Sequence, residues 1–256
     1  MARQPVLFVG HGSPMNAVED NVFSRGHAAL ARLVPRPRVI LAVSAHWESD
    51  GTFTTVDDPP ATIHDFGGFP PELYAMRYAV RGDKALAQRA AVLAGGSATD
   101  GRGLDHGAWS VLHRMYPAAD VPVVQLSLDV RASAAEHLAL GRALAPLRDE
   151  WVLILASGNL THDLRDAFGR LRRGDPATPG WAARFDSDVA RALLARDEAW
   201  LVRALETPDG GRAHPTAEHW LPILYAAGAA DAGDTVSFPV TGFDMGSLSM
   251  RCVLFG

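Results

Sequence analysis

The chain has 256 residues, of which 48% are hydrophobic and 21% charged, and its formal net charge at pH 7 is −5. This composition fits a globular protein with a sizeable core, and the acidic balance argues against nucleic acid or an anionic membrane as a partner. The single cysteine, Cys252, excludes an intramolecular disulfide and a thiolate metal cluster, and its apolar neighbours indicate a buried thiol. Because the sequence shows neither a signal-peptide pattern nor the roughly 20 apolar residues that span a bilayer, we expect a cytoplasmic protein.

Four short apolar runs predict strands that are buried on both faces of a sheet. They span residues 6–9, 39–45, 121–128 and 151–159. The run at 39–45 has no charged residue, is too short for a helix, and leads directly into His46 and Trp47. We therefore expect it to be a central strand with a histidine just beyond its carboxyl end.

Helices are predicted between these strands from apolar periodicity and from cap residues. The expected helices cover residues of about 18–33, 83–93, 108–115, 133–147 and 181–205. Shorter or irregular segments complete the pattern: an edge strand and turn in 50–62, an aromatic loop that lasts until Pro71 begins a short helix, and a polar loop at 97–107. His219 is expected on a short helix that Pro222 begins or kinks, and residues 235–255 predict two antiparallel strands at a sheet edge.

Alternating strands and helices predict the α/β class. We expect a three-layer sandwich in which helices flank a central, mostly parallel (mixed) sheet. Because the sequence contains neither a linker-like stretch nor an internal repeat, we expect one domain over residues 1–256.

Three of the ten histidines, His11, His46 and His162, follow predicted buried strands. The carboxyl ends of parallel strands meet at one sheet edge, which is where ligands bind in open α/β sheets. Neutral imidazoles that converge without thiolates suit Fe(II) or Zn(II) in an open catalytic site. For any one of these histidines alone, an imidazole that fixes a loop explains the position equally well. His64, His106 and His219 are further candidates, whereas His27, His113, His137 and His214 are expected to be core or surface residues.

Eight motifs in this order resemble those of the class III extradiol ring-cleavage dioxygenases, the protocatechuate 4,5-dioxygenase superfamily. They are GHGSPMNA, SAHW, IHDFGGFPPELY, LDHGAW, QLSLD, SGNLTHDLR, AEHWLP and GSLSMR. The chain is most similar to the branch of 4,5-DOPA extradiol dioxygenase-like proteins. The resemblance covers nearly the whole chain, and the motifs are highly specific only when taken together.

The resemblance implies a role for five of the histidines. His11, His46 and His219 would hold the metal. His162 would be the catalytic acid/base and can act as a fourth ligand in a resting zinc form. His106 would lie in the substrate pocket and either assist proton transfer or orient a catecholic hydroxyl. The wider superfamily has a glutamate as its third ligand, whereas this chain has Glu218 directly before His219. We assign the ligand role to His219 and a supporting role to Glu218. The implied cofactor is non-haem Fe(II) in the active form, with Zn(II) possible in the purified protein.

The implied reaction opens the aromatic ring of a catechol with O2, so the partners would be a small aromatic diol and dioxygen. The loop with His64, Asp65, Phe66 and Phe69, together with Trp109, would form the wall of the pocket, although simple core packing explains these aromatic residues equally well. Ser13, Asn159 and Thr161 could bind substrate or orient ligands, but we favour a loop-capping role for each.

Two other functions are compatible with the same histidines. A zinc-dependent hydrolase would use them to activate water instead of dioxygen. A non-enzymatic metal-binding or anion-binding module would use GHGS as a phosphate loop, but this motif lacks the GK[ST] that would follow it. That last interpretation also leaves His162 and His219 without a role.

Overall fold

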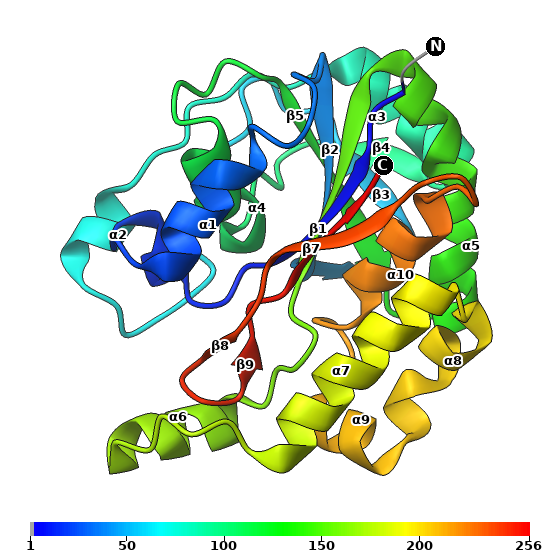
Figure 1. Cartoon of the computed structure of the whole chain (residues 1–256). Helices are drawn as coiled ribbons and strands as arrows, with labels where there is room; N and C mark the ends of the chain where they lie inside the picture. The colour runs from blue at the N-terminus through cyan, green and yellow to red at the C-terminus, as the bar shows by residue number, and fades with distance from the viewer. Residues whose placement is uncertain (1–2) are drawn as a thin grey trace.

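The computed structural model describes residues 3–256, and its centre is an eight-stranded sheet with the order β4-β3-β5-β2-β6-β1-β10-β7 (Figure 1). The strands of this sheet are β1 (Val6–Gly10), β2 (Val39–Ser49), β3 (Phe53–Thr55), β4 (Ser97–Thr99), β5 (Val123–Asp129), β6 (Val152–Gly158), β7 (Val236–Val240) and β10 (Cys252–Phe255). The central pairs β5–β2, β2–β6 and β6–β1 are parallel, whereas β10 pairs antiparallel with both β1 and β7. The predicted mixed, mostly parallel sheet is confirmed.

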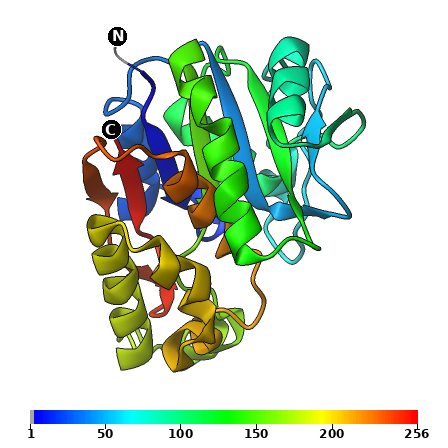
Figure 2. The same cartoon turned by 90° about the vertical axis from the view of Figure 1, so that its right-hand side faces the viewer.

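Helices cover both faces of the sheet and complete the three layers (Figures 1 and 2). The α-helices are α1 (Val22–Leu30), α2 (Pro71–Ala75), α3 (Lys84–Leu93), α4 (His106–Met115), α5 (Ala134–Leu144), α6 (Leu164–Arg173), α7 (Gly180–Ala195), α8 (Glu198–Arg203), α9 (Pro208–Ala213) and α10 (Leu221–Ala229). Short 3₁₀ helices are η1 (Pro14–Ala17), η2 (Ala145–Glu150) and η3 (Ala204–Glu206). Among the described helices, none has the length and apolarity needed to cross a membrane.

Strand β2 shows why the central strands are uniformly apolar. Side chains alternate between the two faces of a strand, and both faces of β2 are covered. Val39, Leu41 and Val43 belong to the core that packs against α3, α5, α7 and α10. Ile40 and Ala42 belong to the opposite core, against α1 and α4. An apolar residue is therefore required at every position of this run.

The parallel register brings the carboxyl ends of the central strands to one edge. Gly10 at the end of β1 pairs with Gly158 at the end of β6, and Ser44 in β2 pairs with Ser157. The residues that follow these positions therefore lie side by side at this edge. His11 and His46 are among them.

The outer strand β4 lies in a segment that was predicted to be a polar loop. It pairs in parallel with β3, so β3 is not the edge strand that the sequence suggested. The backbone N–H of Ser97 donates to Thr52 O at 3.0 Å, and a Cβ at Gly96 would come within 2.2 Å of the same oxygen. This strand therefore forms because a glycine permits close contact with β3, a long-range condition that hydrophobic periodicity does not reveal.

Several element boundaries also differ from the prediction. Helix α1 begins only at Val22, because Asn21 forms a capping box with Ser24. Helix α4 begins at His106 instead of residue 108, since Asp105 accepts a hydrogen bond from the backbone N–H of Ala108. The closing residues form the predicted antiparallel pair, β7 with β10, but a small hairpin of β8 (Phe243–Asp244) and β9 (Leu248–Ser249) is inserted between these strands. Cys252 is buried, as predicted.

Candidate metal centre

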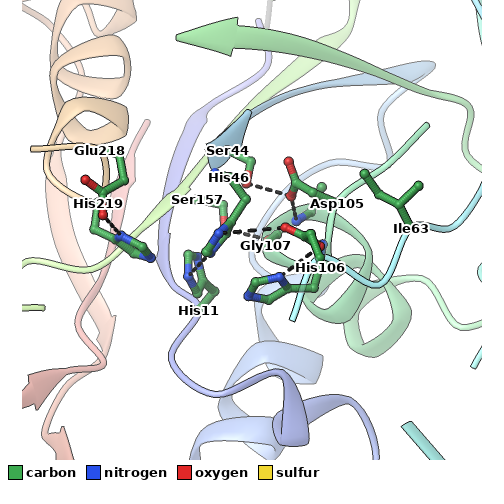
Figure 3. A network of polar contacts seen from close by, with 12 residues as sticks. His11, Ser44, His46, Ile63, Asp105, His106, Gly107, Ser157, Glu218 and His219 are labelled. Atoms are coloured by element: carbon green, nitrogen blue, oxygen red, sulfur yellow. Dashed lines mark hydrogen bonds and ion pairs between the residues drawn. The ribbon is translucent and has the colours of Figure 1, made fainter. Parts of the chain in front are cut away.

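His11, His46 and His106 converge at the carboxyl edge of the sheet, close enough for each to offer one ligand atom to a common ion (Figure 3). These atoms all lie within 4.8 Å of one another, and Nε2 of His11 is 3.2 Å from Nε2 of His46. His11 follows β1 and His46 lies within the extended end of β2. The sheet register therefore brings together residues that are 35 positions apart in the sequence.

The hydrogen bonds of His11 determine which of its nitrogens can bind a metal. The hydroxyl of Ser157 donates to Gly107 O at 2.6 Å and lies 2.9 Å from Nδ1 of His11. A hydroxyl has a single proton, so Ser157 must accept the second contact from Nδ1–H. Nε2 of His11 then carries the lone pair, and this nitrogen faces His46.

His46 is held by a buried polar network behind β2. Its backbone N–H donates to the Ser44 hydroxyl at 3.2 Å, and this hydroxyl donates to Oδ1 of Asp105 at 2.7 Å. Gln125 donates to the other carboxylate oxygen of Asp105. A Cβ at Gly107 would come within 2.5 Å of Ser44 Oγ and 2.9 Å of the His46 ring, so only glycine lets α4 approach this strand.

His219 lies opposite His11 and His46, in the turn that precedes α10 and not on the predicted helix. Its ring centroid is 5.2 Å from that of His11 and 4.8 Å from that of His46. Nδ1 is 3.0 Å from Oε1 of Glu218, so Nδ1–H donates to the carboxylate. Nε2 is buried and has no hydrogen-bond partner within residues 3–256. A buried nitrogen without a partner is costly unless it binds an ion, so this residue fits a metal ligand.

His162 leaves β6 beside His219. The two rings are stacked, with centroids 3.3 Å apart and planes at 9°. The backbone N–H of His162 donates to Ala213 O at 2.8 Å, which ties it to the segment after α9. His162, Glu218 and His219 form a second group whose ligand atoms lie within 4.8 Å of one another. This second group lies beside that of His11, His46 and His106, and the ring of His219 lies between the two.

His11, His46, His162 and His219 are all neutral at neutral pH. Burial, followed by the charges of neighbouring histidines, lowers the pKa of His46 and of His162 to about 3. The same causes place the pKa values of His11 and His219 well below the ordinary value. Metal binding requires the neutral imidazole, so the site is already in the binding form. A set of nitrogen donors without thiolates fits a divalent transition metal such as Fe(II) or Zn(II).

His106 stands on the first turn of α4, with its ring centroid 3.9 Å from that of His46. Its backbone N–H donates to Oδ1 of Asp65 at 2.9 Å, and its Nδ1 lies 3.0 Å from the same oxygen. His64, by contrast, points away from the centre. Its Nε2 lies 3.1 Å from Met76 O, and its ring packs edge-on against Phe66 and Trp109.

The aromatic residues that were expected to line the pocket divide into two groups. Trp109 is fully buried and its Nε1–H donates to Ile63 O at 2.9 Å, so it is a core residue. Phe66 is half-exposed, 5.4 Å from the ring of His106 and 5.2 Å from Phe69. Phe66 therefore borders the histidine cluster, and Phe69 packs against Phe66.

Ser13, Asn159 and Thr161 hold loops together. Ser13 accepts the backbone N–H of Met15 at the start of η1. Asn159 and Thr161 donate to backbone oxygens of Ser249 and Ser247 at 2.9 and 2.7 Å. These contacts match the loop-capping role that we favoured and anchor the β8–β9 hairpin near the centre.

Three of the four histidines that we expected to be core or surface residues are buried in polar contacts. His27 lies 3.2 Å from Gly10 O, His137 is 3.0 Å from the hydroxyl of Tyr225, and His214 is 3.0 Å from Leu160 O. Ser157 and Asp105 also contact site residues, although no motif in the sequence marks them as functional. The only local signal for Asp105 was its position before His106, which is typical of a helix cap.

Comparison with known proteins identifies a family whose members this chain resembles over nearly its whole length. The family model described as the catalytic LigB subunit of aromatic ring-opening dioxygenase matches residues 5–245. The chain is 46% identical to 4,5-DOPA dioxygenase extradiol of Escherichia coli (strain K12) over 99% of this chain and 95% of the relative. It is 41% identical to the protein of the same name from Beta vulgaris, over 95% of this chain and 93% of the relative.

A solved structure shares the fold. The crystal structure of an uncharacterized protein from Escherichia coli K12 superposes with a TM-score of 0.85 at 41% sequence identity. The match covers 99% of this chain and 100% of that chain. The whole fold, including every strand that delivers a histidine, therefore lies within the matched region.

Proposed function

Because this chain belongs to the family of the catalytic LigB subunit of aromatic ring-opening dioxygenases, we propose that it opens the ring of a DOPA-like catechol at a metal held by His11, His46 and His219. Extradiol ring cleavage with O2 follows from the family and from the named relatives. The DOPA-like substrate is supported by two relatives that are named for DOPA and are 46% and 41% identical to this chain. We also propose that the domain extends over residues 1–256.

The observation that carries the ligand set is the lone pair at Nε2 of both His11 and His219. Ser157 and Glu218 each engage Nδ1, so Nε2 remains available in both rings. Figure 3 shows the ring of His219 extending toward His11. Three histidine ligands would leave positions open for a chelating diol and for dioxygen, which is the requirement for an extradiol enzyme.

The proposed metal is Fe(II) in the active enzyme, whereas Zn(II) can fill the same nitrogen set in the purified protein. When bound, Fe(II) supplies Lewis acidity toward the diol and a redox route between the catechol and dioxygen. The chain's own residues bind the ion, orient the ring and manage protons. Phe66 and Phe69 offer apolar surface for the aromatic ring beside His106.

His162 is proposed as the acid/base and not as a required ligand. Its neutral ring can accept the proton of a diol hydroxyl and return it in a later step, because burial keeps the imidazole unprotonated beforehand. Stacking on His219 holds this ring against the metal ligands. His106 is proposed to assist from the opposite side, next to His46.

The direct test is oxygen uptake. Protein reconstituted anaerobically with Fe(II) is mixed with L-DOPA or another catechol in aerated buffer, and O2 consumption is recorded together with the yellow absorbance of a ring-opened semialdehyde. We expect one O2 consumed per ring opened. A protein that turns over no catechol and consumes no O2 with Fe(II), but hydrolyses esters or amides with Zn(II) in air, would contradict the proposal.

A further inference from the structure

Asp65 lies between His46, a proposed metal ligand, and His106, which is proposed to assist proton transfer. One carboxylate oxygen, Oδ1, accepts the backbone N–H of His106 at 2.9 Å and lies 3.0 Å from Nδ1 of the same residue. The other oxygen, Oδ2, is 3.8 Å from Nδ1 of His46. The carboxylate therefore contacts His106 at two atoms and His46 only at long range.

The loop that carries Asp65 is fixed to the start of α4. The backbone N–H of Ile63 donates to Leu104 O at 2.9 Å, and the indole N–H of Trp109 donates to Ile63 O at the same distance. Leu104 precedes α4 and Trp109 lies within it. Because the loop and the helix are joined on both sides of His106, the carboxylate cannot drift away from this residue without breaking these bonds.

The carboxylate is ionised at neutral pH. A carboxylate that is not fully buried carries its charge at neutral pH, and the Asp65 side chain is 23% exposed. An ionised carboxylate only accepts hydrogen bonds, so the nitrogen that faces it carries the ring proton. The Nδ1–H of His106 is not in line with Oδ1 in this geometry, and such contacts tighten when substrate binds.

We propose that Asp65 is a positioning residue that holds His106 as the Nδ1–H tautomer and leaves the Nε2 lone pair available to a hydroxyl of the diol. This inference rests on the proposed function of His106. His162 is proposed to serve one hydroxyl of the diol. When the O–H bond of the other hydroxyl breaks, its proton forms an N–H bond at Nε2 of His106, and the carboxylate of Asp65 stabilises the imidazolium that results. In a later step the same N–H bond breaks and the proton returns to the product.

The test replaces the carboxylate by an amide of the same shape, Asp65→Asn, in the full-length protein. The asparagine oxygen can still accept the backbone N–H of His106, but the amide removes the negative charge that favours Nδ1–H and stabilises the imidazolium. With Fe(II), we expect kcat to fall by about 10- to 100-fold, while KM and metal content stay close to those of the wild type. Glu72→Gln is the matched control, because it removes one acidic charge from the exposed helix α2 beside the same loop, and we expect it to leave kcat unchanged.

The tautomer is read directly by long-range ¹⁵N–¹H correlation spectra of the diamagnetic zinc-loaded protein. The His106 signals are those missing from His106→Gln, and we expect Nδ1–H in the wild type and loss of this pattern in Asp65→Asn. A wild-type spectrum with Nε2–H at His106 would overturn the inference without any variant. An Asp65→Asn protein that keeps wild-type kcat would also overturn it. So would one that loses its metal, because metal loss would show that Asp65 supports the metal ligand His46 and not His106.

The proposed function and the proposed role of Asp65 can be refuted independently of each other. If wild-type protein consumes no O2 with catechols, the proposed function is wrong, yet the spectra of the zinc form still decide whether Asp65 sets the tautomer. If the wild type is active and Asp65→Asn equals it in both kcat and spectrum, only the role of Asp65 is wrong.

Discussion

The histidines of the centre reach it by two different routes. His11, His46 and His162 come from the ends of parallel strands, and the register of β1, β2 and β6 places them together. His106 and His219 come from a helix start and a turn, outside the sheet. Each of these two has a carboxylate at Nδ1, Asp65 for His106 and Glu218 for His219.

This difference indicates how each group is positioned. The backbone hydrogen bonds of the sheet position the strand-end residues, and neighbouring serine hydroxyls, Ser157 for His11 and Ser44 for His46, support them. Residues outside the sheet need specific side-chain contacts and close backbone approach. Gly107 and Gly158 permit this close packing because they have no Cβ. A Cβ at Gly158 would lie 2.3 Å from His219 O, and one at Gly107 would lie 2.9 Å from the His46 ring.

The largest effect is expected where a strand-end ligand is removed. His46→Ala should abolish both metal binding and ring opening, with a loss of activity of at least about 10³-fold, because two imidazoles hold the ion much less tightly than three. Metal analysis after dialysis and oxygen uptake measure the two losses. A His46→Ala protein that keeps a full equivalent of metal would remove His46 from the ligand set.

His162 is also a strand-end residue, but its proposed role is proton transfer. His162→Ala should keep its metal and lose about 10²- to 10⁴-fold in kcat, which is the range of general acid–base catalysis. The same metal analysis and oxygen assay apply, with His46→Ala as the comparison. Metal-free His162→Ala protein would instead make His162 a required ligand.

Gly158→Ala tests whether the close contact between Gly158 and the backbone of His219 positions this histidine. The added methyl group must displace the turn at His219, so we expect a loss of about 1–3 kcal/mol in unfolding free energy and weaker metal binding. Urea unfolding and a metal titration measure these changes. Gly233→Ala is the control, because no described atom lies within 4 Å of its added Cβ. Equal behaviour of the two variants would show that the turn adapts freely.

The last effect is a gradual change with pH and concerns the buried histidines in the metal-free protein. Burial lowers the pKa of His27 and of His214 to about 4, whereas both would titrate near 6.5 when unfolded. Below pH 6.5 the unfolded chain binds more protons than the folded chain. The unfolding free energy therefore decreases as the pH is lowered from 6.5 to about 4, by at most about 1.4 kcal/mol per pH unit for each histidine. Urea midpoints between pH 7 and 4 measure this slope. His214→Gln should reduce it, and an unchanged slope would contradict the pKa of His214.

The sequence alone determined the strands and the strand-end histidines. Uniform apolar runs are a local signal, because a strand covered on both faces needs an apolar side chain at every position, as Val39 to Val43 show. Once the strands are parallel, their ends must meet, so the convergence of His11, His46 and His162 was predictable. The sequence motifs around these histidines also carry the resemblance to the family.

Only the tertiary structure decided the contacts between distant segments. Strand β4, the turn that carries His219, and the pairing of Asp65 with His106 across 41 positions leave no periodic pattern in the sequence. Each depends on a backbone approach or a side-chain contact that exists only after the sheet has formed. A local pattern records which face of an element is buried, but it does not record which carboxylate will reach a given imidazole.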